Sequence, residues 1–145
     1  MIVGIGVDIV AVDRFNKWTA YSLDQLCKIF TLQELADSKD EQGVLIAEKL
    51  ATRFAAKEAF YKALSAALVE WQLTEKQFGL LSLCRYVSVV YSEWKTPLLH
   101  VTWESIVALI GPLPLQVTMH LSLSHEKATA IAFVVLSAGL PVQNT

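Results

Sequence analysis

A carboxylate stands in the middle of the apolar stretch with which this chain begins. Residues 2–12 read Ile-Val-Gly-Ile-Gly-Val-Asp-Ile-Val-Ala-Val, which is rich in the β-branched side chains typical of strands. Side chains alternate along a strand, so one face should carry Ile2, Gly4, Gly6, Asp8 and Val10. The two glycines indicate either a bulge or the close approach of a ligand or another backbone to Asp8. A buried, unpaired carboxylate destabilises a domain by several kcal/mol, so another group must compensate for Asp8.

A second carboxylate lies within the longest predicted helix. Apolar residues recur at helical spacing from residue 42 or 44 to residue 68, with alanines between them. Glu58 falls within the stripe that should face the core, Lys62 follows one turn later, and Arg53 and Lys57 should point elsewhere. The spacing alone fits a surface ion pair between Glu58 and Lys62 equally well. A divalent cation would compensate both Asp8 and Glu58.

The rest of the chain predicts short helices and strands. Helical patterns occupy residues 13–18 and 23–35, with a capping box of Thr31 and Glu34, and residues 104–110, before Gly111 and Pro112. Strands are predicted at 85–91, at 98–103 and in a hairpin of 117–124 and 129–136 around His125-Glu-Lys127. Residues 38–43 predict a loop, and residues 69–84 fit either an irregular segment or a short helix opened by Thr74-Glu-Lys-Gln77.

The first strand of that hairpin has two different faces. Val117, Met119, Leu121 and Leu123 share one face, and Thr118, His120, Ser122 and Ser124 share the other. The hydroxyl row with the neighbouring His125 suits a phosphate, and solvated hydroxyls beside an ordinary turn fit as well. Ser122 and His125 are close enough in sequence to form a nucleophile and its base. No Gly-x-Ser-x-Gly elbow surrounds either serine, so a serine hydrolase is not favoured.

Composition narrows the class of protein. Apolar residues make up 54% and charged residues 18%, which indicates one globular domain with apolar surface that a homo-oligomer could cover. A net charge of -2 with scattered Lys and Arg does not fit a nucleic-acid binder. Cys27 and Cys84 have no metal-ligand spacing and are interpreted as buried thiols in a reducing cytoplasm. Neither a signal peptide nor a membrane span is expected, because Asp8 interrupts the apolar start and prolines break the longest uncharged stretch.

Three motifs together carry a family resemblance. They are Gly4-Ile-Gly-Val-Asp-Ile-Val10 with Arg14 after it, Arg53-Phe-Ala-Ala-Lys-Glu-Ala-Phe-Tyr-Lys-Ala-Leu64, and Leu121-Ser-Leu-Ser-His-Glu126. In this order and spacing they closely resemble the holo-acyl-carrier-protein synthases, small 4'-phosphopantetheinyl transferases. The resemblance implies an α+β fold with the long helix packed on antiparallel sheet, assembled as a homotrimer. The chain length and the residues themselves predict one domain over residues 1–136, followed by a loose tail at 137–145.

The resemblance also implies a reaction and its site. The phosphopantetheine arm of coenzyme A moves to a serine of apo-acyl carrier protein, with release of adenosine 3',5'-bisphosphate. Asp8 and Glu58 match the ligands of Mg²⁺, and the serine proton goes either to Glu58 or to a metal-bound water. Lys62 would contact the pyrophosphate and would be catalytic together with the two carboxylates. The positions that match binding of the coenzyme A phosphates are Arg53, Lys62, Ser122 and His125, with His125 reaching across a subunit boundary.

Departures from the family pattern concern the carrier protein. The contacts expected for it are Arg14, Phe15, Trp18 and Lys28, whereas Tyr21 and Asp24 stand where positive charge is usual. Ser65-Ala-Ala-Leu-Val-Glu70 replaces the usual glycine-rich turn. These changes keep a second hypothesis open, a non-catalytic module that binds carrier protein or coenzyme A. A third hypothesis is a Mg²⁺-dependent nucleotide phosphohydrolase, and the sequence leaves open whether the carrier is of fatty-acid or polyketide type.

Overall fold

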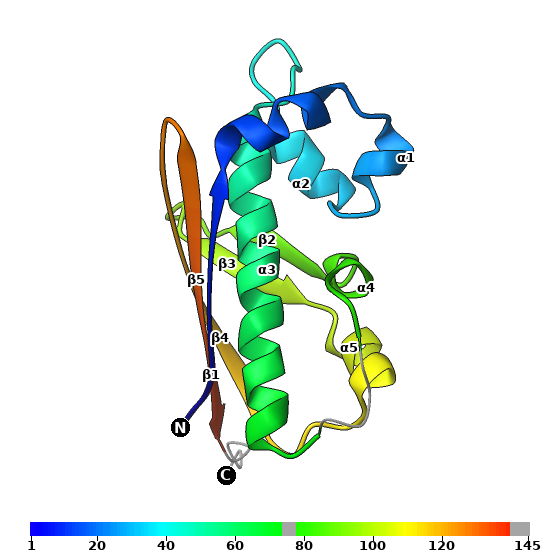
Figure 1. Ribbon diagram of the computed structural model, residues 1–145, viewed down its shortest axis with the longest axis vertical. Helices are drawn as coiled ribbons and strands as arrows, with labels where there is room; N and C mark the ends of the chain where they lie inside the picture. The colour runs from blue at the N-terminus through cyan, green and yellow to red at the C-terminus, as the bar shows by residue number, and fades with distance from the viewer. Residues whose placement is uncertain (74–77, 140–145) are drawn as a thin grey trace.

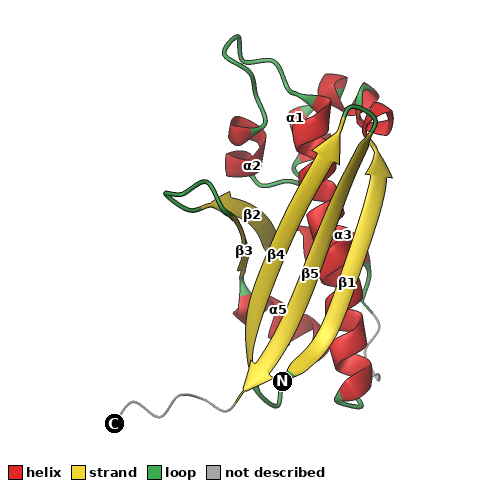
Figure 2. Cartoon of the chain, turned by 90° about the vertical axis from the view of Figure 1, so that its left-hand side faces the viewer, coloured by secondary structure: helices red, strands yellow, loops and turns green. Residues whose placement is uncertain are grey.

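One long helix lies along one face of a three-stranded antiparallel sheet (Figures 1 and 2). The computed structural model describes residues 1–73 and 78–139. The sheet has the order β1-β5-β4, from β1 (Ile2–Ala11), β5 (Thr129–Gly139) and β4 (Gln116–Glu126), and the helix is α3 (Ala47–Glu70). Antiparallel strands β2 (Val87–Tyr91) and β3 (Pro97–Val101) form a second, smaller sheet. This arrangement confirms the predicted α+β fold.

Short helices fill the connections between these elements. They are the 3-10 turns η1 (Val12–Phe15) and η2 (Lys17–Ala20) and the helices α1 (Leu23–Leu26), α2 (Leu32–Asp37), α4 (Leu80–Cys84) and α5 (Trp103–Ile110). The helical pattern predicted over 23–35 forms two helices, because Ser22 and Thr31 each form a capping box and start a helix. The predicted Thr31–Glu34 box is confirmed. Residues 74–77, where a helix start was predicted, lie outside the described residues.

The long helix begins later and ends later than predicted. The Asp40 side chain accepts hydrogen bonds from the backbone of Gln42 and Val44, which fixes a turn where the helix was expected to start. Ile46 is still extended, at φ -101° and ψ 117°, so α3 begins at Ala47. At the other end α3 continues to Glu70, because the segment after Leu64 has no glycine to stop it.

Glycines bring β1 directly onto α3. A Cβ added to Gly6 would lie 2.7 Å from the Ala63 nitrogen and closer still to the Ala59 carbonyl oxygen, and Gly4 meets the Ala63 carbonyl group in the same way. The backbone of α3 is therefore what comes close to the strand face that carries Asp8, as one of the predicted alternatives had it. Gly4, Gly6, Asp8 and Val10 are buried as predicted, but Ile2 is exposed, because the register with β5 shifts between Ile2 and Gly4 and turns its side chain outward.

The β4–β5 hairpin differs from its prediction at both ends. Glu126 pairs with Thr129, so the turn is Lys127 and Ala128, and His125 belongs to the strand. At the other end β5 runs to Gly139 and Ser137 pairs with Thr118, so 137–139 are part of the sheet rather than a loose tail. Residues 140–145 lie outside the described part of the chain. The strands predicted at 85–91 and 98–103 and the helix predicted at 104–110 are confirmed with small shifts of their ends.

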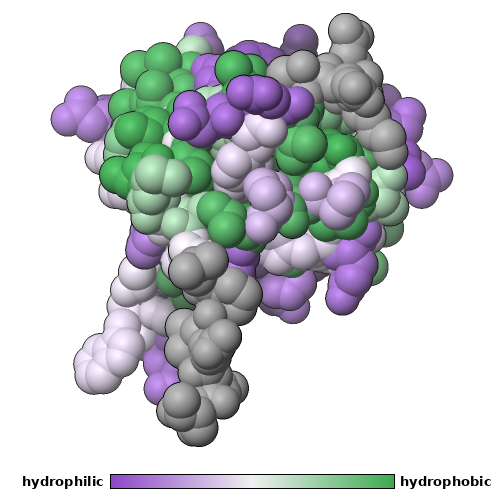
Figure 3. All heavy atoms as spheres, turned by 90° about the horizontal axis from the view of Figure 1, so that it is seen from below, coloured by the Kyte–Doolittle hydropathy of each residue, from purple (hydrophilic) through white to green (hydrophobic). Residues whose placement is uncertain are grey.

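No element in the described part of the chain covers the second face of the large sheet. Figure 2 views this face directly, with α3 behind it. Its exposed apolar side chains are Ile5, Val7, Ile9, Ile131 and Phe133. Figure 3 shows further apolar surface between polar groups at the end of the molecule where β1 begins. Among the described residues no helix is long and apolar enough to cross a membrane.

Candidate active site

Asp8 and Lys62 form an ion pair where β1 crosses α3. The Asp8 carboxylate is buried, and its Oδ1 lies 2.8 Å from the Lys62 Nζ. The same ammonium donates a hydrogen bond to the Val7 carbonyl oxygen at 3.0 Å. Lys62 is still half exposed, with 49% of its side chain accessible. Lys62 therefore pairs with Asp8 rather than with Glu58, and its ammonium can still meet a ligand from solvent.

Glu58 lies next to this pair on α3, one turn before Lys62. Burial and the negative charge of Asp8 raise the pKa of Glu58 above its ordinary value, and a hydrogen-bonding contact between the two carboxyl groups acts in the same direction. The positive charges of Lys62 and Arg14 lower the pKa of Glu58, with smaller effects. Only the family resemblance predicted that Asp8 and Glu58 lie at one site, and the structure places them side by side.

The two carboxylates fit a divalent cation. Asp8 Oδ2 is buried without a hydrogen-bond partner among the described residues, so one oxygen of the pair is free to bind a ligand. No cluster of three or more His, Cys, Asp or Glu side chains suited to a metal occurs in 1–73 and 78–139. Two carboxylates, with the other positions left to substrate phosphates and water, is the donor set that Mg²⁺ commonly takes. Asp8 and Glu58 are thus the residues that can hold the ion.

A pocket whose walls hold two cations, two carboxylates and a histidine opens near Asp8 and Glu58. It has a volume of about 410 Å³ and is lined by Asp37, Glu48, Lys49, Thr52, Arg53, Tyr91, Pro97, Leu123 and His125. Asp8 of β1 lies opposite Ala132 of β5, and Ala132 lies opposite Leu123 of β4. Leu123, in the pocket wall, is therefore two strand spacings, about 10 Å, from Asp8. Two of the predicted phosphate-binding residues, Arg53 and His125, therefore meet in one pocket.

The side chains of this pocket are held in place by neighbouring groups. Arg53 is almost fully buried, and its Nη1 donates to the Lys49 carbonyl oxygen at 3.1 Å. Its Cζ lies 5.6 Å from the centre of the Tyr91 ring, in a cation–π contact. Nε of Arg53 is buried with no partner in the described part of the chain. His125 Nδ1 lies 3.3 Å from Glu48 Oε1, which orients the ring toward α3.

Ser122 lies apart from these residues. It pairs with Phe133, which pairs with Val7, so its side chain points to the uncovered face of the sheet. Its exposed position agrees with the predicted alternation along β4. Within one chain, the structure therefore does not bring Ser122 together with Arg53 and His125.

The predicted carrier contacts divide into surface and core. Arg14 and Lys28 are exposed and Trp18 is partly exposed, as a docking surface requires. Phe15 is fully buried, with its ring 4.6 Å from that of Trp18 and 5.5 Å from that of Phe54. Its predicted role as an exposed anchor is therefore wrong, because the aromatic cluster encloses the ring. Phe15 supports Trp18 from below.

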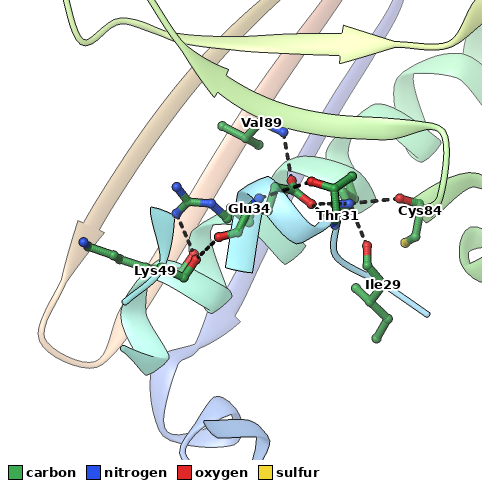
Figure 4. A network of polar contacts seen from close by, with 9 residues as sticks. Ile29, Thr31, Glu34, Lys49, Cys84 and Val89 are labelled. Carbon is green, nitrogen blue, oxygen red and sulfur yellow. Dashed lines mark hydrogen bonds and ion pairs between the residues drawn. The ribbon is translucent and has the colours of Figure 1, made fainter. Parts of the chain in front are cut away.

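A buried ion pair behind the site was missed in the sequence. Lys57 Nζ lies 2.8 Å from Glu34 Oε2, and each side chain is 1% exposed (Figure 4). Glu34 also accepts from the backbone of Thr31 and Val89, so it joins α2, α3 and β2. The prediction that Arg53 and Lys57 point away from the core is wrong. The aromatic residues Phe54, Phe60 and Tyr61, three or four positions from Lys57, were the available sign of its burial.

The cysteines show the expected inert pattern. Both thiols are free, Cys84 is buried and Cys27 is partly buried. Burial raises the pKa of Cys84 to about 11. The thiol therefore stays protonated near neutral pH and has no place in the candidate chemistry.

Known proteins share both the sequence and the fold. The 4'-phosphopantetheinyl transferase superfamily matches residues 4–105. A holo-[acyl-carrier-protein] synthase of Treponema pallidum is 36% identical over 138 residues, which cover 94% of this chain and 96% of the relative. One from Bacillus thuringiensis is 33% identical, covering 95% of this chain and 98% of its own. The chain belongs to the 4'-phosphopantetheinyl transferase superfamily and, within it, to the holo-[acyl-carrier-protein] synthases.

Solved structures agree with this assignment. An acyl carrier protein synthase of Mycobacterium tuberculosis superposes with a TM-score of 0.65 at 30% identity, over 96% of this chain and 100% of that one. A holo-(acyl-carrier-protein) synthase of Bacillus anthracis, solved in complex with CoA (3',5'-ADP), gives 0.67 at 28% identity, over 96% and 99%. The resemblance drawn from the three motifs is thereby confirmed.

Proposed function

We propose that this chain transfers the 4'-phosphopantetheine arm of coenzyme A to a serine of apo-acyl carrier protein, with Mg²⁺ bound, and releases adenosine 3',5'-bisphosphate. The observation that carries the proposal is the arrangement of Asp8, Glu58 and Lys62 where β1 meets α3. One buried carboxylate oxygen there has no hydrogen-bond partner among the described residues, and an ammonium is open to solvent. This arrangement suits a pyrophosphate with its counter-ion.

The reaction exchanges one phosphorus–oxygen bond for another. The serine oxygen of the carrier forms a bond to the phosphorus that bears the pantetheine arm. The bond from that phosphorus to the bridging oxygen of the pyrophosphate breaks, and its electron pair leaves with adenosine 3',5'-bisphosphate. The serine hydroxyl loses its proton, and the phosphodiester remains on the carrier. The protein's tasks are to hold these groups in line, to balance charge and to accept the proton.

Each member of the site has one of these tasks. Lys62 is fixed by Asp8 and the Val7 carbonyl, so its half-exposed ammonium is a positioned charge for the pyrophosphate. Glu58 or a water held by the metal accepts the proton of the serine, since these are the two bases that such a site would offer. Asp8 and Glu58 hold Mg²⁺, which when bound neutralises charge on the pyrophosphate oxygens.

The pocket of Arg53 and His125 is the proposed place for the nucleotide end of coenzyme A. Arg53 and His125 contribute positive or hydrogen-bonding groups to it, and Lys49 adds another cation. Its distance of about 10 Å from Asp8 allows one nucleotide to reach both the carboxylates and the pocket. The buried Arg53 guanidinium, held over Tyr91, is the anchor for a phosphate.

A homotrimer is part of the proposal. The uncovered sheet face carries five large exposed apolar side chains, Ile5, Val7, Ile9, Ile131 and Phe133, and an interface would remove them from water. Ser122 points to the same face, so it would reach a nucleotide only from a neighbouring subunit. Sedimentation velocity should give a trimer for the unaltered chain and a smaller species for Phe133→Glu, since a charge would then be buried in the interface. A monomer at all concentrations would contradict this part of the proposal.

Intact-mass spectrometry of the carrier tests the reaction. The chain is incubated with coenzyme A, Mg²⁺ and each of several apo-carriers, and the carrier should gain the mass of the arm. Glu58→Gln should lose most of this activity, whereas Glu93→Gln, the same change at an exposed turn position, should keep it. No gain with any carrier would refute the proposal. Coenzyme A binding without turnover would then favour a non-catalytic module, and phosphate release without carrier would favour a phosphohydrolase.

A further inference from the structure

A buried carboxylate joins three elements of the fold. Glu34 of α2 is 1% exposed, and both of its carboxylate oxygens accept hydrogen bonds. Oε2 accepts from the Thr31 backbone at 2.9 Å and from the Lys57 ammonium at 2.8 Å. Oε1 accepts from the Val89 backbone at 2.9 Å (Figure 4). The capping box of α2 uses only the bond to Thr31, so the bonds to α3 and β2 do something besides starting the helix.

Stability alone does not explain a charge at this position. Taking two charges out of water costs about as much as their attraction returns, so apolar side chains of similar size can often replace a buried ion pair without loss of stability. What apolar contacts do not supply is direction. Hydrogen bonds from a carboxylate fix the distance and angle between the groups that they join. The location of the groups bound to Glu34 is therefore informative.

The two distant partners of Glu34 are neighbours of a contact in the proposed nucleotide pocket. Lys57 follows Arg53 by one turn and lies on the same side of α3. Val89 precedes Tyr91 by two residues, so both lie on the same face of β2. The Arg53 Cζ is 5.6 Å from the centre of the Tyr91 ring. Glu34 therefore spans the space between α3 and β2 one step away from the place where Arg53 and Tyr91 meet.

The small sheet depends on such bonds for its position. Within residues 1–73 and 78–139, β2 pairs with β3 alone, and neither strand pairs with the large sheet. A two-stranded sheet has little stability of its own. Lys57 also holds the segment before β2, because its ammonium donates to the Cys84 carbonyl oxygen at 2.9 Å. Glu34 and Lys57 thus fix the backbone both before β2 and within it.

We infer that Glu34 is a positioning residue for the nucleotide pocket. Its bonds to Lys57 and Val89 set how close β2 comes to α3, and this spacing decides how the Arg53 guanidinium meets the Tyr91 ring. The inference rests on the proposed function, because it takes this pocket as the place where coenzyme A binds. Glu34 is buried and acts only through these neighbours. A guanidinium that is already held against a ring loses less freedom when it binds a phosphate.

Isothermal titration calorimetry with adenosine 3',5'-bisphosphate tests the inference, because this nucleotide lacks the pantetheine arm. Glu34→Gln keeps the size of the side chain, but its amide nitrogen cannot accept a hydrogen bond. That nitrogen should face Val89, since the amide oxygen then keeps its two other bonds. Glu34→Gln should raise Kd about threefold, as Tyr91→Leu should, because both changes disturb one contact. The double variant should also show a rise of about threefold, whereas independent effects would multiply to roughly ninefold.

Two further variants separate positioning from stability. Ile106→Ala opens a cavity in the core at α5, which does not line the pocket, so it should lower the free energy of unfolding and leave Kd unchanged. The double variant Glu34→Met/Lys57→Met replaces the ion pair by apolar groups and should be more stable than Glu34→Met. Its Kd should still be about threefold above that of the unaltered chain, since the bond to Val89 is absent.

The titration separates failure of the inference from failure of the proposed function. An unchanged Kd in Glu34→Gln, or a roughly ninefold rise when Tyr91→Leu is added, would overturn the inference and leave the proposed function intact. An equal rise in Ile106→Ala would also overturn it, because lost stability would then account for the effect. An unaltered chain that transfers the arm but does not bind this nucleotide would overturn the inference alone. One that does neither would overturn the proposed function as well.

Discussion

Replacing Gly6 by alanine should force β1 away from α3. The added Cβ would lie 2.7 Å from the Ala63 nitrogen and 2.9 Å from the Ala59 carbonyl carbon, whereas carbon atoms in contact prefer about 3.5–4.0 Å. Both neighbours are backbone atoms, so neither can rotate aside. The strand must move by roughly 1 Å, and we expect a loss of about 3 kcal/mol in the free energy of unfolding, the upper end of typical overpacking. Asp8, two residues further on, would shift away from Glu58, and arm transfer would slow with it.

Urea denaturation followed by tryptophan fluorescence measures this loss. Gly79→Ala is the matched control, because no described atom lies within 4 Å of its added Cβ and φ is -100°. There alanine should change the free energy of unfolding by less than about 1 kcal/mol, because it restricts the unfolded chain but is a poorer N-cap of α4 than glycine. Equal stabilities of Gly6→Ala and Gly79→Ala would refute the close backbone packing that places Asp8.

Three further predictions concern charged groups. Lys57→Met should lower the free energy of unfolding by about 3–5 kcal/mol, because it leaves Glu34 charged and buried. The same change at the exposed Lys95 should alter the free energy of unfolding by less than about 0.5 kcal/mol. Equal losses in the two variants would contradict the buried ion pair. Without Mg²⁺, the raised pKa of Glu58 makes its ionisation destabilising to the folded state. The unaltered chain should therefore lose stability relative to Glu58→Gln as pH rises above 4.5, and below that pH the difference in stability between the two proteins should stay constant. The opposite trend in denaturation midpoints would contradict this. Arg53→Ala should raise KM for coenzyme A at least tenfold and Tyr91→Leu about threefold, with KM for the carrier unchanged. Equal KM values for coenzyme A in the unaltered chain and both variants would contradict binding of coenzyme A in this pocket.

Local patterns predicted the elements that depend on local chemistry. The strand at β1, the Thr31–Glu34 capping box and the two faces of β4 follow from alternation and capping, which are properties of neighbouring residues. The start of α3 was mispredicted because the Asp40 side chain competes for backbone groups that the helical pattern alone would have used. The exposure of Ile2 depends on a register shift with β5, which lies at the far end of the chain.

Long-range pairing explains what the sequence could not predict at the site. Glu34 and Lys57 lie in different helices, and nothing in either helix's periodicity joins them. The pairing of Asp8 with Lys62 instead of the surface pair Glu58–Lys62 depends on how closely β1 approaches α3, which the glycines allow but do not specify. The two carboxylates were predicted as a pair only because the three motifs together resemble a family, and the structure then placed them side by side.

A crystal structure of the chain with coenzyme A and Mg²⁺ tests the central claim most directly. We predict a cation bound by Asp8 and Glu58, with the pyrophosphate within reach of the Lys62 ammonium and the nucleotide phosphate at Arg53. The Asp8 oxygen that has no hydrogen-bond partner among the described residues should then be a metal ligand. A cation bound elsewhere, with that oxygen still without a ligand and coenzyme A outside the pocket of Arg53 and His125, would contradict the proposed site.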